Sequence, residues 1–191
     1  MPLILASSSP YRRRLLQRLG IAFECVSPGI DETPLADESP QDLACRLALA
    51  KARAVALAHP QQLVIGSDQV ASLQGDIMGK PGTAAGAVEQ LKASSGKEIR
   101  FDTAVALVRQ DPPLEAVHLE PFRVQFRALS DREITAYVAH DKPYDCAGSF
   151  KWEGLGIVLF DALRGDDPTS LEGLPLIALS RMLSQAEVKI L

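Results

Sequence analysis

The sequence LILASSSPYRRRLLQRL at residues 3–19 predicts a strand, a turn and a helix in direct succession. The apolar run 3–6 indicates a buried strand. After the serines that follow, Ser9 and Pro10 are favourable residues for the N-cap and the first position of a helix. Such a turn brings hydroxyl groups, free N–H groups and the positive end of a helix dipole to one place. The stretch therefore predicts a phosphate-binding turn.

Arg12 is the arginine best placed to act on that phosphate. By helical phase it shares a face with the leucines of this helix, which must pack on the sheet. Because a guanidinium cannot lie in an apolar core, we expect Arg12 to project past the strand end, over the turn. Arg13 and Arg14 fall outside this face. The alternative interpretation is a capped surface helix with three exposed arginines.

Length and composition indicate one globular domain spanning residues 1–191. The chain is 47% hydrophobic and 23% charged, which is typical of soluble proteins. No apolar run approaches the ~20 residues of a membrane span. The N-terminus lacks the basic segment followed by an apolar segment that is typical of a signal peptide. We therefore expect a cytoplasmic protein without a membrane partner. The net charge of −4 disfavours nucleic acid as a partner.

Any bound metal is expected to have oxygen ligands. The three cysteines are odd in number and far apart, and the three histidines are equally scattered. These spacings indicate reduced thiols and disfavour a disulfide framework or a zinc site. A hard divalent cation, Mg²⁺ or Mn²⁺, is the expected cofactor.

Two charged features flank the expected phosphate site. Asp31 and Glu32 follow a Pro-Gly turn and are candidate metal ligands, although a solvated acidic turn is the alternative. Lys51 lies at the margin of the apolar face of a helix that Ser39 and Pro40 begin. It could point into a cleft, or its alkyl stem could cover the core while its ammonium stays in water.

Asp68 is the first choice for the catalytic residue. The run 62–65 predicts a central strand buried on both faces, and Asp68 comes just past its carboxyl end. Open α/β sheets place their chemistry at this position. The alternative is an Asp that closes a local turn.

The remaining pattern alternates strands with helices and predicts an α/β fold. Further strands are expected at 101–108, 117–126 and 157–160, and further helices at 83–94, 130–138 and 173–185. The run GDIMGKP at 75–81 has the wrong spacing for a Walker A loop and indicates a hairpin that holds Lys80 on a turn. The loop CAGSFKWEG at 146–154 is typical of a ligand-binding wall.

The chain resembles the Maf family of nucleotide pyrophosphatases. The motifs LASSSPYRR, Asp31-Glu32, Lys51-Ala52, GSDQV, GKP and CAGSFKWEGLG occur in the family's order from residue 3 to about residue 180. Each motif is weak alone, and together they are specific. One departure is Ala104, where the family usually has glycine, which puts the local strand geometry in question.

The resemblance implies an α/β protein with an elongated mixed β-sheet flanked by helices, in two lobes with a central cleft, as in ITPase-like proteins. It also implies a homodimer that hydrolyses nucleoside triphosphates at the α–β phosphate link with a divalent metal. Such a reaction needs positioning and charge neutralisation more than covalent chemistry.

The family's functional positions match particular residues of this chain. Asp68 matches the proposed proton acceptor, which would orient and deprotonate the attacking water. Glu32 matches an acid that binds the metal together with Asp68. The phosphate-binding positions are matched by Ser7, Arg12, Lys51 and Lys80.

Three further positions resemble the family's specificity residues: Tyr11, Gln69 and Glu153. The pyrimidine-preferring branch usually has arginine, threonine and glutamine there, whereas GSFKWEG resembles the branch that hydrolyses 7-methyl-GTP. Methylation at N7 makes guanine cationic, so the Tyr11 ring would attract it. Glu153 could accept two hydrogen bonds from the guanine edge, while Trp152 is either a second stacking residue or a core anchor.

The sequence leaves three hypotheses open. The first is a 7-methyl-GTP pyrophosphatase, and the second is the same chemistry on dTTP and UTP. The third is a non-catalytic nucleotide-binding regulator of cell division. Asp68 distinguishes the third from the others, because a binding module needs cations for phosphate but no base beside them.

Overall fold

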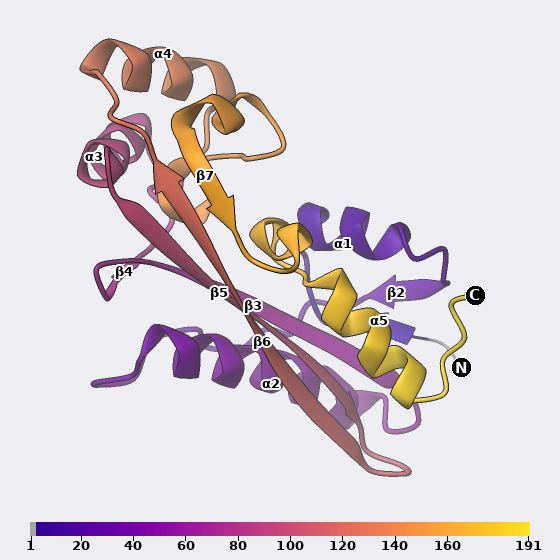
Figure 1. The fold of residues 1–191 in the computed structure, drawn as a ribbon. Helices are drawn as coiled ribbons and strands as arrows, with labels where there is room; N and C mark the ends of the chain where they lie inside the picture. The colour runs from indigo at the N-terminus through magenta and orange to yellow at the C-terminus, as the bar shows by residue number, and fades with distance from the viewer. Residues whose placement is uncertain (1–2) are drawn as a thin grey trace. The chain divides into compact units, whose positions relative to one another are not determined.

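The computed structural model describes residues 3–191. Its helices and strands are shown in Figure 1. The α-helices are α1 (Pro10–Gln17), α2 (Pro40–Ala58), α3 (Ala84–Ser94), α4 (Asp131–Asp141) and α5 (Leu176–Gln185). The strands are β1 (Leu3–Leu5), β2 (Phe23–Cys25), β3 (Leu63–Leu73), β4 (Asp76–Met78), β5 (Glu98–Arg109), β6 (Leu114–Phe126) and β7 (Phe160–Arg164). Three 3₁₀ helices are η1 (Ala147–Ser149), η2 (Leu155–Leu159) and η3 (Pro168–Glu172).

The strands form one mixed sheet in the order β2-β1-β3-β5-β6-β7, and β4 pairs with β3. Strand β1 is parallel to both β2 and β3, whereas β4 pairs antiparallel with β3 and β7 antiparallel with β6. The predicted α/β fold with a mixed sheet flanked by helices is confirmed. Ala104 does not interrupt its strand, since β5 is continuous around it.

The chain divides into two compact units, and β3, β5 and β6 contribute residues to both. The first unit comprises 102–121, 166–191 and the described part of 1–69. The second comprises 70–101 and 122–165.

The core of the first unit follows from strand alternation. Leu3 and Leu5 of β1, with Leu63 and Ile65 of β3, pack against apolar residues of α1 and α5. The opposite face of these strands meets α2, which Figure 1 shows on the other side from α1 and α5. Gly66 lies on that opposite face. A Cβ there would lie 2.1 Å from the Ala48 carbonyl oxygen, so only glycine lets α2 approach this closely.

The helix starts are those that the sequence predicts. The hydroxyl of Ser9 accepts a hydrogen bond from the N–H of Arg12, and that of Ser39 accepts one from the N–H of Asp42. Thr83 and Ser130 cap α3 and α4 in the same way. Each cap satisfies an N–H group that has no partner inside its helix, which is a local effect readable from sequence.

The second unit has an aromatic centre. The ring of Phe150 makes edge-to-face contacts with those of Phe101, Phe126 and Phe160, at centroid distances of 5.4, 5.6 and 4.8 Å. Such pairs stabilise beyond the apolar area they bury. Phe150 therefore anchors the 146–154 segment to the core of this unit.

Three predicted boundaries are wrong. The strand expected at 62–65 continues as β3 to Leu73, because the polar side chains after Gly66 find partners inside the fold. Asp68 therefore lies within a strand and not past its end. The strand expected at 157–160 begins only at Phe160, since the N–H groups of Gly154 and Gly156 both bond to the Lys151 carbonyl and close a turn.

The closing helix also starts later than predicted. Residues 173–175 are not helical, and α5 begins at Leu176. Gly173 has a φ of +94°, a left-handed conformation that ends η3 and turns the chain before α5. The helix predicted from Gly173 therefore starts three residues later, and the conformational freedom of the glycine serves the turn.

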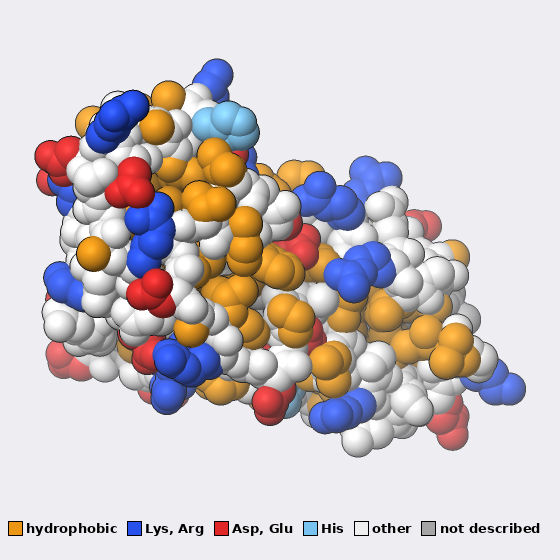
Figure 2. Space-filling model, turned by 45° about the horizontal axis from the view of Figure 1, so that its top comes forward, with side chains coloured by type: hydrophobic (Ala, Val, Ile, Leu, Met, Phe, Trp, Pro, Cys, Tyr) orange, Lys and Arg blue, Asp and Glu red, His pale blue; other side chains and the backbone are white. Residues whose placement is uncertain are grey.

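Figure 2 shows basic side chains interspersed with acidic and apolar ones over the face in view. Within residues 3–191, the helices are too short or too polar to cross a bilayer.

The capping box of α4 supports a prediction about stability and pH. The carboxylate of Glu133 accepts hydrogen bonds from the N–H and hydroxyl of Ser130 and contacts Arg127 at 2.9 Å. These contacts lower the pKa of Glu133 from 4.5 to about 2. The ionised carboxylate therefore stabilises the fold fully above about pH 4.5, and this contribution is lost as the pH falls towards 2.

We expect Glu133→Ala to lower the Tm at pH 7 by about 2–4 °C. The difference from the wild type should shrink as the pH falls below 4.5, as thermal denaturation followed by circular dichroism would show. Glu133→Gln is the matched control, because it keeps a capping side chain without the charge. A Tm difference independent of pH would contradict the assignment.

Candidate active site

A buried ion pair joins α2 to β3 in the first unit. The Nζ atom of Lys51 lies 2.6 Å from Oδ1 of Asp68 and 2.9 Å from Oε1 of Glu32. The side chains of Lys51 and Asp68 are only 6% and 10% exposed, whereas that of Glu32 is 56% exposed. The alternative interpretation places the Lys51 ammonium in bulk water, and this is not what the structure shows. A buried cation and carboxylate must be paired, and these two are.

Gly66 makes this pair possible. Gly66 and Asp68 are two residues apart on β3 and therefore face α2 together. The close approach of α2 at Gly66, against Ala48 and Ala52, places the neighbouring Lys51 within reach of Asp68. In the GSD sequence, Gly66 thus lets α2 pack closely and Asp68 supplies the carboxylate.

The acidic pair at 31–32 divides into two roles. The carboxylate of Asp31 accepts hydrogen bonds from the N–H and hydroxyl of Thr33, at 2.9 and 2.7 Å. These bonds lower the pKa of Asp31 and close a local turn. Glu32 instead reaches Lys51. The solvated-turn interpretation therefore describes Asp31, and the candidate metal ligand is Glu32.

Arg12 lies close to the same carboxylates. Its Nε donates a hydrogen bond of 2.8 Å to the carbonyl of Gly173. Burial lowers the pKa of Arg12, and the negative charges of Asp68 and Glu32 oppose this shift. An arginine remains charged under such conditions. Two cations and two carboxylates are therefore gathered in the first unit.

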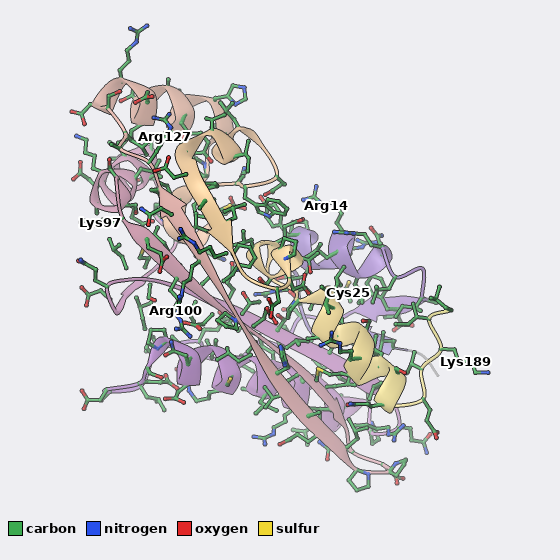
Figure 3. All side chains as sticks on the ribbon, in the orientation of Figure 1. Arg14, Cys25, Lys97, Arg100, Arg127 and Lys189 are labelled. Atoms are coloured by element: carbon green, nitrogen blue, oxygen red, sulfur yellow. The ribbon has the colours of Figure 1, made fainter. Side chains whose placement is uncertain are left out.

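Ser7 and Tyr11 lie on the turn and first helix that precede this cluster. Ser7 is a buried residue, and its hydroxyl accepts a hydrogen bond of 3.1 Å from the N–H of Ser9. Arg14, labelled in Figure 3, lies over the ring of Tyr11 with its Cζ atom 5.5 Å from the centroid. The Tyr11 ring thus already receives one cation, which shows that it can act as a cation–π acceptor.

The segment 166–177 is a support that the sequence analysis missed. The buried carboxylate of Asp167 accepts hydrogen bonds from the N–H and hydroxyl of Thr169 and from the N–H of Ile177, at 2.9, 2.6 and 2.7 Å. These bonds close the chain into a rigid turn before α5. The signal was present as polar turn residues between a strand and a helix, in the sequence GDDPTSLEGLP.

Two carbonyl groups of this segment accept hydrogen bonds from side chains of predicted site residues. The Gly173 carbonyl accepts from Arg12, as described above. The Ser170 carbonyl accepts a hydrogen bond of 2.7 Å from Nε2 of Gln69, whose same nitrogen lies 3.1 Å from the Thr103 hydroxyl. Gln69 and Arg12 are therefore oriented by one turn.

In the second unit, Glu153 lies on a tight turn closed on Lys151. The carbonyl of Lys151 accepts hydrogen bonds from the N–H groups of Gly154 and Gly156, at 3.2 and 3.1 Å. Lys151 is itself held to α4: its N–H donates to the Tyr137 hydroxyl at 2.9 Å, and its Nζ donates to the Asp141 carbonyl at 3.0 Å. Burial raises the pKa of Tyr137, so its hydroxyl stays protonated.

Lys80 follows β4 in the second unit and is exposed. The structure thus gathers Arg12, Glu32, Lys51 and Asp68 in the first unit, with Ser7, Tyr11 and Gln69 also belonging to that unit. Lys80 and Glu153 belong to the second. Their roles, and the roles of the first group, stay predictions.

The carboxylates of Asp68 and Glu32 are oxygen donors of the type that hard divalent cations bind. Both direct an oxygen to one point, where Lys51 lies. Within residues 3–191, His, Cys, Asp and Glu form no group of three or more placed to hold a metal ion. Mg²⁺ is commonly bound by one or two carboxylates together with substrate phosphates and water.

The chain is similar to proteins of known family. The model of the family described as Maf-like protein matches residues 2–186. A protein named 7-methyl-GTP pyrophosphatase from Aromatoleum aromaticum is 58% identical over 181 residues, which cover 95% of this chain and 93% of the relative. Proteins of the same name from Albidiferax ferrireducens and Nitrosococcus oceani are 54% and 52% identical, each over 99% of this chain and 95% of the relative.

Two solved structures share the fold. The Ham1 protein of Staphylococcus aureus has a TM-score of 0.55 at 13% identity, covering 97% of this chain and all of that one. The HAM1 protein of Coxiella burnetii has a TM-score of 0.53 at 16% identity, covering 97% and 99% of the two chains. At these identities the likeness concerns the fold alone.

Proposed function

The chain belongs to the Maf family, and from this premise we propose that it is a nucleotide pyrophosphatase that converts 7-methyl-GTP to 7-methyl-GMP and pyrophosphate. Relatives at 52–58% identity bear the name 7-methyl-GTP pyrophosphatase. The observation that carries the proposal is the buried contact of Asp68 with Lys51, beside Glu32 and Arg12. A base next to cations is what hydrolysis of a phosphate anhydride requires.

Charge neutralisation is the main requirement of the proposed reaction. A triphosphate carries about four negative charges, and its cleavage between the α and β phosphates adds charge to the leaving pyrophosphate. Arg12, Lys51 and Lys80 neutralise this charge, and Ser7 and the start of α1 add hydrogen-bond donors. Arg12 is pre-oriented by the Gly173 carbonyl, so little reorganisation is needed when the phosphate arrives.

Asp68 is the proposed proton acceptor. Lys51 holds one carboxylate oxygen by a short hydrogen bond, which fixes the orientation of the acid. The other oxygen is then directed to accept a proton from the attacking water. A water held in this way is already positioned for attack on the phosphate, which lowers the entropic cost of the reaction.

Asp68 and Glu32 are also the residues proposed to hold a divalent metal, Mg²⁺ or Mn²⁺. When bound, such an ion supplies charge neutralisation at the phosphates and acidifies coordinated water. We also propose that residues 1–191 act as one functional domain in the cytoplasm, and that the chain forms a homodimer, as the family resemblance implies.

Base recognition is proposed for Glu153, Tyr11 and Gln69. The Glu153 carboxylate accepts from the N1–H and N2–H₂ groups of guanine and offsets the charge of the methylated ring. Tyr11 stacks on that ring. The amide nitrogen of Gln69 is committed to Ser170 and Thr103, so its oxygen is the atom proposed to contact the nucleotide. A carboxylate repels the carbonyl oxygens of thymine and uracil, which disfavours dTTP and UTP.

A nucleotide screen tests the proposal. The full chain would be incubated with 7-methyl-GTP, GTP, dTTP or UTP and with Mg²⁺ or Mn²⁺, and the release of pyrophosphate and of phosphate would be measured separately. We expect pyrophosphate as product. The kcat/KM for 7-methyl-GTP should be at least about tenfold above the values for GTP, dTTP and UTP, because one charge-assisted contact between Glu153 and the cationic base contributes about this factor. Fastest cleavage of dTTP or UTP would favour the pyrimidine alternative.

A further inference from the structure

One side chain of the second unit bridges two segments that carry candidate site residues. Gln90 on α3 is half-buried, and its Nε2 donates a hydrogen bond of 2.8 Å to the carbonyl of Gly79. Its Oε1 accepts a hydrogen bond of 2.5 Å from the hydroxyl of Ser149. Gly79 immediately precedes Lys80, and Ser149 begins the run that leads to Glu153. Both ends of one amide are therefore used, in opposite directions.

The Ser149 end of this bridge is rigid. Ser149 is fully buried and has a φ of +61°, a left-handed conformation that is unfavourable for a residue with a Cβ atom. The neighbouring Phe150 is inserted among three other phenylalanine rings. Such strain persists only where surrounding contacts over-determine it, so the direction of the Ser149 hydroxyl is set by the fold.

The turn that carries Lys80 is held at a second point. The N–H of Gly82 donates a hydrogen bond of 3.0 Å to the carbonyl of Tyr144, which lies just before the 146–154 segment. The turn at 79–82 thus bonds to Gln90 on one flank and to residue 144 on the other. Lys80 itself is exposed, so its position depends on how this backbone is held.

We propose that Gln90 is a positioning residue that couples the Lys80 turn to the Glu153 segment. The proposal rests on the proposed function, in which Lys80 binds phosphate and Glu153 reads the base. A rigid hydrogen-bonded link between the two makes correct base binding favour the correct phosphate position. Gln90 contacts neither the base nor the phosphates in this scheme and acts through the backbone of Gly79 and the side chain of Ser149.

Two single variants separate the two ends of the bridge. In Gln90→Glu the carboxylate still accepts from Ser149 but cannot donate to the Gly79 carbonyl. In Ser149→Ala the Gly79 bond remains and the loop end is lost. Gln90→Leu removes both. Glu89→Gln is the matched control, because Glu89 precedes Gln90 on α3 and is exposed. Ser149→Gly replaces Ser149→Ala if the latter fails to fold, since glycine tolerates the positive φ.

The readouts are the kcat/KM values of the full chain for 7-methyl-GTP and for GTP. We expect Gln90→Glu to lower both by about tenfold and leave their ratio unchanged, because every nucleotide has the phosphates. Ser149→Ala should lower the ratio of the 7-methyl-GTP value to the GTP value by about fivefold. It should lower the GTP value less than Gln90→Glu does, because Gln90 keeps its bond to Gly79. Gln90→Leu should show both effects, and Glu89→Gln neither.

Hydrogen exchange measured by mass spectrometry gives a readout independent of catalysis. The coupling predicts faster exchange at residues 79–82 in Ser149→Ala, although the substitution is far away in the sequence. Unchanged exchange there, or an unchanged selectivity ratio in both Ser149→Ala and Gln90→Leu, would overturn the proposal. In Ser149→Ala and Gln90→Leu, an equal loss for both nucleotides that follows the fall in Tm would overturn it too. Failure of the proposed function is recognised separately, because it would show in the wild type.

Discussion

Replacing Asp68 by asparagine should lower the kcat for pyrophosphate release by about three orders of magnitude. Asparagine has the same shape but cannot accept a proton at neutral pH, and the Lys51 ammonium would keep only Glu32 as its anionic partner. Nucleotide binding should persist, because Arg12, Lys51 and Lys80 remain. Initial rates with 7-methyl-GTP and calorimetric binding of the same nucleotide would measure the two quantities.

The same variant separates an enzyme from a regulator. Asp76→Asn serves as the control, because Asp76 is an exposed aspartate of β4. Thermal denaturation should accompany the assay, since Asp68 is buried and paired. If the wild type bound nucleotide tightly without turnover, and Asp68→Asn bound it equally well, the non-catalytic alternative would hold.

Replacing Glu153 by glutamine should lower kcat/KM for 7-methyl-GTP by between about 10-fold and 100-fold. The amide offers one oxygen acceptor in place of a carboxylate and carries no charge to offset the methylated ring. The values for dTTP and UTP should change little or rise, because the repulsion of their carbonyl groups is removed. Kinetics on all three nucleotides with one preparation would measure the change in selectivity.

Glu153→Asp is the matched control for charge. It keeps the carboxylate on a shorter side chain, so it should retain more selectivity than Glu153→Gln. The turn itself should survive both changes, because its hydrogen bonds do not involve the Glu153 side chain. The Lys151 carbonyl closes it, and the Lys151 N–H donates to the Tyr137 hydroxyl. An equal loss on every nucleotide would remove the specificity role.

The helix caps and the buried faces could be predicted from the sequence, because the interacting residues lie within a few positions of one another. The caps at Ser9, Ser39 and Ser130 act on N–H groups of their own helices. The apolar periodicities likewise predicted the buried faces of β1 and α1. Both depend on backbone geometry that neighbouring residues share.

The boundaries that failed depended on distant partners. The sequence predicts a strand that ends before Gly66, whereas residues 66–69 continue it. They stay in β3 because Ser67 donates to the Gly173 carbonyl and Gln69 to the Ser170 carbonyl. Gly66 and Asp68 meanwhile face α2. A single sequence does not reveal that these polar side chains find hydrogen-bond partners about 100 residues away.

The order of motifs was sufficient for the Maf family and for the types of residue that could serve a nucleotide pyrophosphatase. Only the tertiary structure decided which carboxylate Lys51 would meet, and that Asp31 would close a turn while Glu32 would not. It also brought Arg12 to Gly173 and Gln90 to both Gly79 and Ser149. Caps and amphipathic faces follow from backbone geometry over a few residues, whereas these contacts join positions that only packing brings within hydrogen-bond distance.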